Sequence, residues 1–167
     1  MFASLIESRL LYGLTGAWLR VAERRRLDGF HARCLRQILK IPPAYFSRIS
    51  NQKVLASAGR PKASTMLCRR QLVHFGKVLR SPSGSVLKDV SFIGDTLAPA
   101  TTRYVRRVGR PRQEWIPCVL SEAWRITGTS ASNLHTYVND HKTWKDLANR
   151  SVSQCIFLNS FFLGACL

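Results

Sequence analysis

Hydrophobic residues recur at helical spacing in the segment that precedes a pair of prolines. Projected at about 100° per residue, one face of this segment carries Leu27, Phe30, Cys34, Leu35, Ile38 and Leu39. The opposite face carries Arg26, Arg33, Arg36 and Lys40. The helix ends before Pro42-Pro43, because neither ring nitrogen can donate a backbone hydrogen bond and the first ring disfavours helical geometry at the residue before it. The pattern predicts an amphipathic helix with a basic outer face.

A second amphipathic helix is predicted from about Ala63 to Arg80. Its apolar side carries Leu67, Leu72, Phe75, Val78 and Leu79. Its polar side carries Arg69, Arg70, Lys77 and Arg80. Between the two helices, Ser50 is placed to cap a short helix through Ala58, and Gly59 suits the left-handed position that ends it.

The rest of the chain shows weaker periodicity. Residues 81–113 are rich in Ser, Gly, Pro and Thr and predict a long basic loop with room for a short hairpin. Apolar spacing predicts a helix over 115–126, and Asp140 is placed to cap a last helix that carries Trp144. We expect a mainly α fold, a small helical bundle. Its regions are helices at 1–80, the loop at 81–113, helices at 114–150 and an apolar tail at 151–167.

The charge balance points to a polyanionic partner. The chain has 26 Lys and Arg against 9 Asp and Glu, a formal net charge of +17. Residues 29–88 contain no acid and twelve Lys or Arg, an imbalance that costs self-repulsion unless a partner neutralises it. Arginine, whose planar fork matches phosphate and base edges, supplies 19 of the cations. RNA, DNA and anionic membranes all fit this charge, and the share of arginine favours nucleic acid as the partner.

A third basic segment lies at the end of the predicted loop. Its five arginines are Arg103, Arg106, Arg107, Arg110 and Arg112. An extended basic string of this kind can follow a phosphate chain or enter a minor groove. Gly109-Arg110-Pro111 is also the core of the AT-hook, but Val108 stands where that motif has an arginine, so the match is incomplete.

Several other classes are disfavoured by composition. Five widely spaced cysteines are an odd number, and no signal peptide is recognisable, so we expect an intracellular protein, nuclear or cytoplasmic, that is not secreted. The apolar stretch 155–167 is 13 residues long, too short to span a bilayer. No membrane span is expected.

An ordered series of short motifs resembles one known family, the region after the polymerase core of non-LTR (LINE-type) retrotransposon reverse transcriptases. The series covers roughly residues 5–150. It comprises Leu11-Tyr12-Gly13, Trp18, Leu27-Asp28-Gly29-Phe30-His31-Ala32-Arg33-Cys34-Leu35-Arg36-Gln37-Ile38-Leu39, Ser50-Asn51, Val54-Leu55, Arg69-Arg70-Gln71-Leu72, Phe75-Gly76-Lys77-Val78-Leu79-Arg80, Gly109-Arg110-Pro111-Arg112, Trp115, Asp140-His141 and Trp144.

The resemblance implies a thumb-like helical region at 1–80, followed by a C-terminal extension. In the family such a region holds RNA template and nascent DNA near the polymerase. Five arginines would form the cationic framework: Arg33, Arg36, Arg69, Arg70 and Arg80. Tyr12, Trp18, Phe30, Leu35, Trp115 and Trp144 would be structural. The catalytic palm would lie before Met1, so the resemblance implies a fragment that lacks it.

Catalysis by the chain alone is not expected. Two-metal nucleotidyl transfer needs clustered carboxylates, whereas the nine acids are scattered with no adjacent pair. His31 and Cys34 on one helix could join Cys68 and His74 on another to bind zinc, but cysteines beside apolar stripes are more often small core residues. We expect no cofactor, no metal and no enzymatic activity.

Three other interpretations of the sequence stay open. The chain could be a helical protein-interaction module or a non-functional retroelement-derived fragment, in which the cations have no selected partner. It could also be a cationic membrane-surface protein that uses the apolar tail from Cys155.

Overall fold

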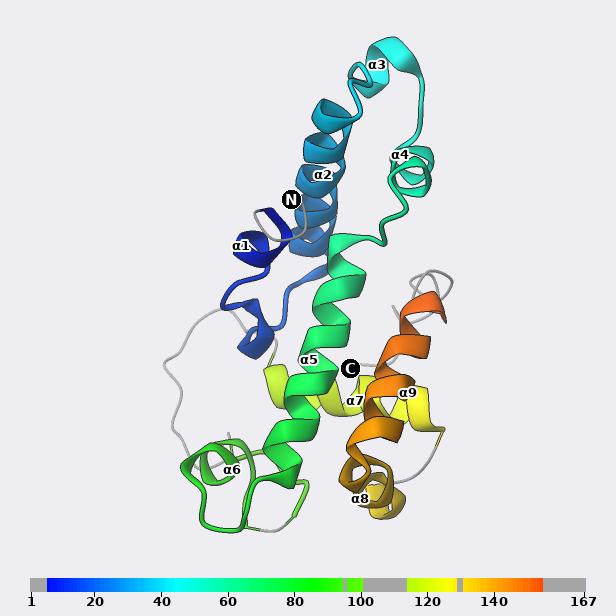
Figure 1. The fold of residues 1–167 in the computed structure, drawn as a ribbon. Helices are drawn as coiled ribbons and strands as arrows, with labels where there is room; N and C mark the ends of the chain where they lie inside the picture. The colour runs from blue at the N-terminus through cyan, green and yellow to red at the C-terminus, as the bar shows by residue number, and fades with distance from the viewer. Residues whose placement is uncertain (1–5, 95, 101–113, 129–130, 155–167) are drawn as a thin grey trace, which may run out of the picture. The chain divides into compact units, whose positions relative to one another are not determined.

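The computed structural model describes residues 6–94, 96–100, 114–128 and 131–154. Within these ranges the chain forms nine α-helices and one 3-10 turn, and no strand (Figure 1). This confirms the mainly α fold. The elements are α1 (Ser8–Leu10), η2 (Leu14–Gly16), α2 (Val21–Ile38), α3 (Ala44–Ser47), α4 (Asn51–Ser57), α5 (Ala63–Arg80), α6 (Val86–Ser91), α7 (Trp115–Thr127), α8 (Ala131–Asn139) and α9 (His141–Gln154).

The chain divides into two compact units inside helix α5, between Cys68 and Arg69. Unit 1 contains α1, α2, α3, α4 and the first turns of α5. Unit 2 contains residues 15–18 and the described residues from Arg69 onward. From the sequence we place the boundary at Arg80, where the Gly- and Pro-rich segment begins. In the structure the boundary between the two units falls inside α5: its residues up to Cys68 belong to unit 1, and those from Arg69 belong to unit 2.

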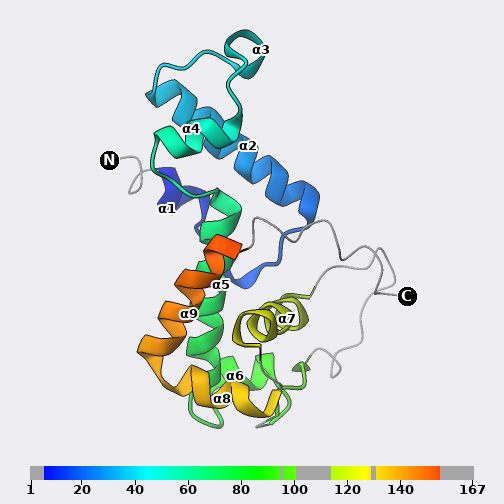
Figure 2. The ribbon, with the colours of Figure 1, turned by 90° about the vertical axis from the view of Figure 1, so that its right-hand side faces the viewer.

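The core of unit 1 lies between α2 and α4, which pack against each other (Figure 2). Leu35, Val54 and Leu55 are buried there, with Ile41 and Ile49 packed around them. The predicted caps of α4 are confirmed. Ser50 Oγ accepts a hydrogen bond from the Lys53 amide at 3.3 Å, and Gly59 follows the helix with φ +60°, the left-handed geometry that glycine adopts without strain.

The buried side of α2 is rotated away from the predicted apolar face. The buried residues are His31, Ala32, Leu35 and Arg36. By contrast, Phe30 is 48% exposed and Ile38 is 54% exposed, although both belong to the hydrophobic stripe. The rotation has a physical reason: two polar side chains of α2 find buried hydrogen-bond partners, and a satisfied polar group tolerates burial.

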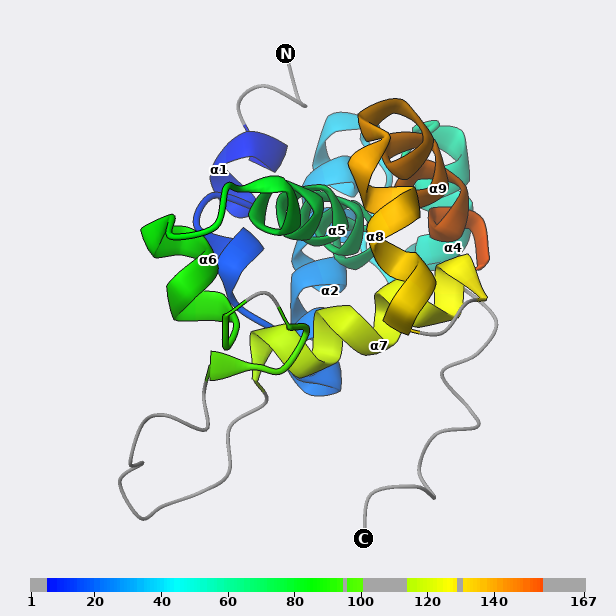
Figure 3. The same ribbon diagram turned by 90° about the horizontal axis from the view of Figure 1, so that it is seen from below.

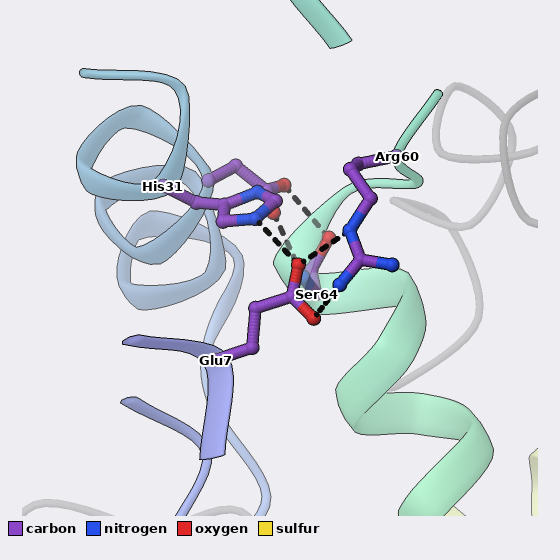
Figure 4. A network of polar contacts seen from close by, with 5 residues as sticks. Glu7, His31, Arg60 and Ser64 are labelled. Atoms are coloured by element: carbon purple, nitrogen blue, oxygen red, sulfur yellow. Dashed lines mark hydrogen bonds and ion pairs between the residues drawn. The ribbon is translucent and has the colours of Figure 1, made fainter. Parts of the chain in front are cut away.

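Polar side chains join α2 to the segments around it (Figure 4). Glu7 is buried and accepts hydrogen bonds from Arg60 Nε at 3.0 Å and Arg60 Nη2 at 2.6 Å. His31 Nε2 lies 3.4 Å from the same carboxylate. Close by, Asp28 accepts from the Ser64 amide at 2.8 Å and the Ser64 hydroxyl at 2.7 Å. Asp28 therefore caps the start of α5 from a different helix, where a carboxylate is favoured.

The core of unit 2 is built around Phe75 on α5. Its ring centroid lies 6.2 Å from that of Phe92 and 6.3 Å from those of Trp115 and Trp144. The helices α7, α8 and α9 pack on one another (Figure 3). Trp144 also donates its indole N–H to the Leu72 carbonyl at 2.8 Å, which pairs the one polar atom of this buried ring.

Two helices of unit 2 were not predicted from the sequence. Residues 86–91, inside the segment interpreted as a loop, form α6, and Ser85 Oγ caps it by accepting from the Lys88 amide at 3.3 Å. Helix α8 precedes Asp140. The predicted cap at Asp140 is confirmed, because its carboxylate accepts from the Thr143 hydroxyl and the Lys142 amide. These hydrogen bonds hold the pKa of Asp140 below its usual value, and the bond from the Thr143 hydroxyl has the largest effect. Residues 101–113 lie outside the described residues.

Candidate nucleic-acid interface

The outer face of α5 carries the clearest group of unengaged cations. Arg69, Arg70 and Lys77 are exposed, while Leu72 and Phe75 on the same helix are buried. Within the described part of the chain, no side-chain hydrogen bond or ion pair engages these three cations. Arg70 and Lys77 are seven residues apart, two turns, so they lie on one side about 10 Å apart along the helix axis. We refer to these three residues as the α5 cations.

Arg80 is predicted to belong to the same surface, but its guanidinium makes a hydrogen bond within unit 2. Its Nη1 donates to the Val138 carbonyl at 2.7 Å, near the end of α8, and the side chain is half-buried. This bond satisfies one of the carbonyls that a helix C-terminus leaves without an intrahelical partner. Arg80 therefore contributes to packing of unit 2 and presents fewer free donors than the α5 cations.

In unit 1, some of the predicted basic residues of α2 are exposed and one is buried. Arg26 and Arg33 are exposed and seven residues apart, which places them on one side of the helix. Lys40 is also exposed, but it lies beyond the last residue of α2 in a left-handed conformation, with φ +54°. The expectation of an exposed basic face on α2 is confirmed for Arg26 and Arg33, whereas Lys40 is exposed but does not belong to the helix.

For Arg36 the same expectation is wrong. The residue is 6% exposed, and its guanidinium donates to the Pro42 carbonyl at 3.0 Å, the Ile49 carbonyl and the Asn51 Oδ1 at 3.1 Å. Arg36 also lies 3.4 Å from Ser47 Oγ. The chain turns back over the end of α2 and directs main-chain carbonyls at this position, which only the five-donor fork of arginine can satisfy together. Arg36 is thus a structural residue.

The carboxylates of unit 1 are occupied inside the fold. Glu7 is held by Arg60 and His31, and Asp28 by Ser64. Glu23 accepts from the Arg20 amide at 2.7 Å at the start of α2. These acids stabilise helix ends and buried contacts, and within the described residues no ion pair joins them to Arg26 or Arg33.

His74, at the margin of the basic side of α5, is disfavoured as a phosphate ligand by its surroundings. Its ring centroid lies 5.6 Å from that of Trp115. Burial, and secondly the positive charge of Lys77, lower the pKa of His74 below its usual value near 6.5. The side chain is therefore mostly neutral at neutral pH and packs as an aromatic ring.

The remaining candidates are the arginines of the predicted basic loop and the residues considered for zinc. Arg103, Arg106, Arg107, Arg110 and Arg112 lie outside the described residues. Cys68 is buried and Cys34 half-buried, and no group of three or more metal-binding side chains gathers within the described ranges. None of the described helices combines the length and apolar character needed to cross a membrane.

Comparison with protein-family models, with curated proteins and with solved structures finds no match to this chain.

Proposed function

We propose that this chain binds structured RNA or an RNA–DNA duplex, mainly through phosphates, and that the α5 cations are the centre of the binding surface. The observation that carries the proposal is the set of exposed, unengaged side chains of Arg69, Arg70 and Lys77. They lie in a stretch of 60 residues without a single acid.

Physical chemistry supports nucleic acid over a merely solubilising role. A surface that only confers solubility mixes both signs of charge, whereas the exposed side of α5 carries cations alone. Two of the α5 cations are arginines, which bind phosphate with two parallel hydrogen bonds. Cations spaced along a rigid helix can follow a phosphate backbone, and contacts of this kind position a ligand without reading its sequence.

The resemblance described above fits this proposal. In our interpretation the chain is derived from the thumb and C-terminal extension of a LINE-type reverse transcriptase, and it holds a template–primer duplex without carrying out polymerisation itself. Arg33 and the arginines of residues 103–112 are further candidates for phosphate contacts.

Fluorescence anisotropy with a labelled RNA hairpin tests the proposal directly. Phosphate contacts release counterions, so affinity falls steeply with salt, and we expect strong binding at about 50 mM salt and a large loss at about 300 mM. The triple variant Arg69→Glu, Arg70→Glu, Lys77→Glu is expected to lose affinity by about tenfold or more and to show a shallower salt slope.

The matched control reverses three exposed cations on α9, in the variant Lys142→Glu, Lys145→Glu, Arg150→Glu. Both triple variants change the net charge by the same amount, so the comparison separates a local surface from overall charge. Equal weakening by the two variants would contradict the role of α5. Absence of hairpin binding at low salt, or binding that is insensitive to salt, would contradict the proposed function as a whole.

A further inference from the structure

The short helix α3 follows α2 at the tip of unit 1 (Figure 2). It carries two adjacent, exposed aromatic side chains. Tyr45 is 76% exposed and Phe46 is 73% exposed. Their ring centroids are 4.4 Å apart with an angle of 40° between the planes. The rings therefore contact each other and still leave most of their surface open to solvent, where apolar area is unfavourable without a partner.

The backbone under the two rings is tied down by hydrogen bonds. The buried guanidinium of Arg36 binds the carbonyls of Pro42 and Ile49, at either end of the loop. Ser47 Oγ donates to the Pro42 carbonyl at 3.1 Å, and the Phe46 amide donates to the Pro43 carbonyl at 3.0 Å. A platform that is ordered before binding loses little conformational entropy when a ligand settles on it.

The charged residues that flank α3 in the sequence are all cations. Lys40, Arg48 and Lys53 are exposed, and the acid-free stretch 29–88 encloses all of them. The Arg48 backbone is left-handed, with φ +51°, and ends α3. Open aromatic faces beside a cationic surface are the combination by which proteins bind unpaired nucleotides, with bases stacked on the rings and phosphates near the cations.

We infer that Tyr45 and Phe46 form a stacking platform for an unpaired base in a single-stranded segment of RNA or DNA. The inference rests on the proposed function and refines it, because it adds a second kind of contact to the phosphate contacts of α5. Charge complementarity favours this partner over an apolar protein surface, which would leave the three cations uncompensated.

The test compares two probes with the full chain, a labelled single-stranded oligouridylate and a blunt-ended RNA–DNA duplex. The double variant Tyr45→Leu, Phe46→Leu keeps apolar side chains but removes the flat rings. We expect it to weaken oligouridylate binding by about tenfold and duplex binding by less than about twofold. Tyr45→Trp is expected to retain oligouridylate binding. A 2-aminopurine base in the single strand should be quenched by the parent chain and not by the double variant.

Tyr12→Leu is the matched control, since Tyr12 is 87% exposed in the same unit and should change neither affinity. The inference is overturned if the double variant weakens both probes equally, weakens neither, or leaves 2-aminopurine quenched. It is also overturned if the parent chain binds the duplex but no single strand, a result that would leave the role of α5 intact. Loss of binding to phosphatidylserine vesicles, with oligouridylate binding unchanged, would assign the rings to a membrane instead.

Discussion

Gly76 of α5 and Trp144 of α9 pack so closely that no side chain fits between them. A Cβ atom built on Gly76 would lie 2.5 Å from Cδ1 of the Trp144 ring, far inside van der Waals contact. The same indole donates its N–H to the Leu72 carbonyl, one turn earlier on α5. The absence of a side chain at position 76 therefore allows the indole to reach the α5 backbone, and Phe75 packs against the same ring.

Gly76→Ala is expected to destabilise unit 2. Overpacking a rigid core costs about 1–3 kcal/mol, and here the strained contact is with a buried aromatic ring that also makes a hydrogen bond. Gly29→Ala is the control. Gly29 lies in the middle of α2 with open space around it, so alanine should stabilise that helix by about 0.5–1 kcal/mol. Urea unfolding should show shifts of opposite sign, and equal shifts would contradict the packing argument.

Arg36→Lys is expected to destabilise unit 1 although it keeps the charge. An ammonium is a compact point with three donors, and it cannot bridge the Pro42 and Ile49 carbonyls and Asn51 in the way the guanidinium does. Leaving buried acceptors unsatisfied costs about 1–3 kcal/mol. Arg33→Lys, at an exposed position on the same helix, should change the free energy of unfolding by less than about 0.5 kcal/mol. Similar values for the two variants would show that Arg36 is not a structural residue.

Hydrophobic periodicity and caps predicted most of the helices. Helix α5 has the predicted bounds, Ala63 to Arg80, because apolar residues repeat throughout it and Pro61 and Gly84 lie beyond its ends. Helix α6 was missed, since glycines and prolines on both sides of it indicate a loop and its six residues are too few to show a period. A serine cap was the one available signal.

The candidate site was harder to predict, and the reason differs from residue to residue. Arg69 and Arg70 could be placed on the outer face because their helix buries its apolar side in the ordinary way. Arg36 could not, because its acceptors are mostly main-chain carbonyls that a side-chain pattern does not reveal. Tyr45 and Phe46 lie between Pro43 and Arg48, in a segment too short for a periodicity argument.

Asp28→Ala is expected to loosen the start of α5. Asp28 supplies a helix cap from α2, with bonds to both the amide and the hydroxyl of Ser64, and loss of a helix cap costs about 0.5–2 kcal/mol. Asp146→Ala, at an exposed position on α9, is the control and should be nearly neutral. Because the cap joins two side chains, the losses in the free energy of unfolding caused by Asp28→Ala and Ser64→Ala should be less than additive. Full additivity in a double-mutant cycle would contradict the contact.

The stability of unit 2 should decrease as the pH falls below about 6.5, in part because of His74. Its pKa is lowered by burial and by Lys77, so the folded state binds a proton less readily than the unfolded chain. Stability from this group is therefore complete above the unfolded pKa and is lost as the pH falls through the folded pKa. His74→Phe keeps a ring beside Trp115 and removes the titration. The urea midpoint should fall between pH 7.5 and pH 5.5, and the fall should be larger for the parent chain than for His74→Phe. Subtracting one fall from the other cancels the contribution of the other histidines.

Lys77→Met should raise the pKa of His74 in an NMR titration, because it removes the second of the two causes. An unchanged pKa would leave burial as the sole cause, and equal acid sensitivity of the parent chain and His74→Phe would contradict the linkage altogether.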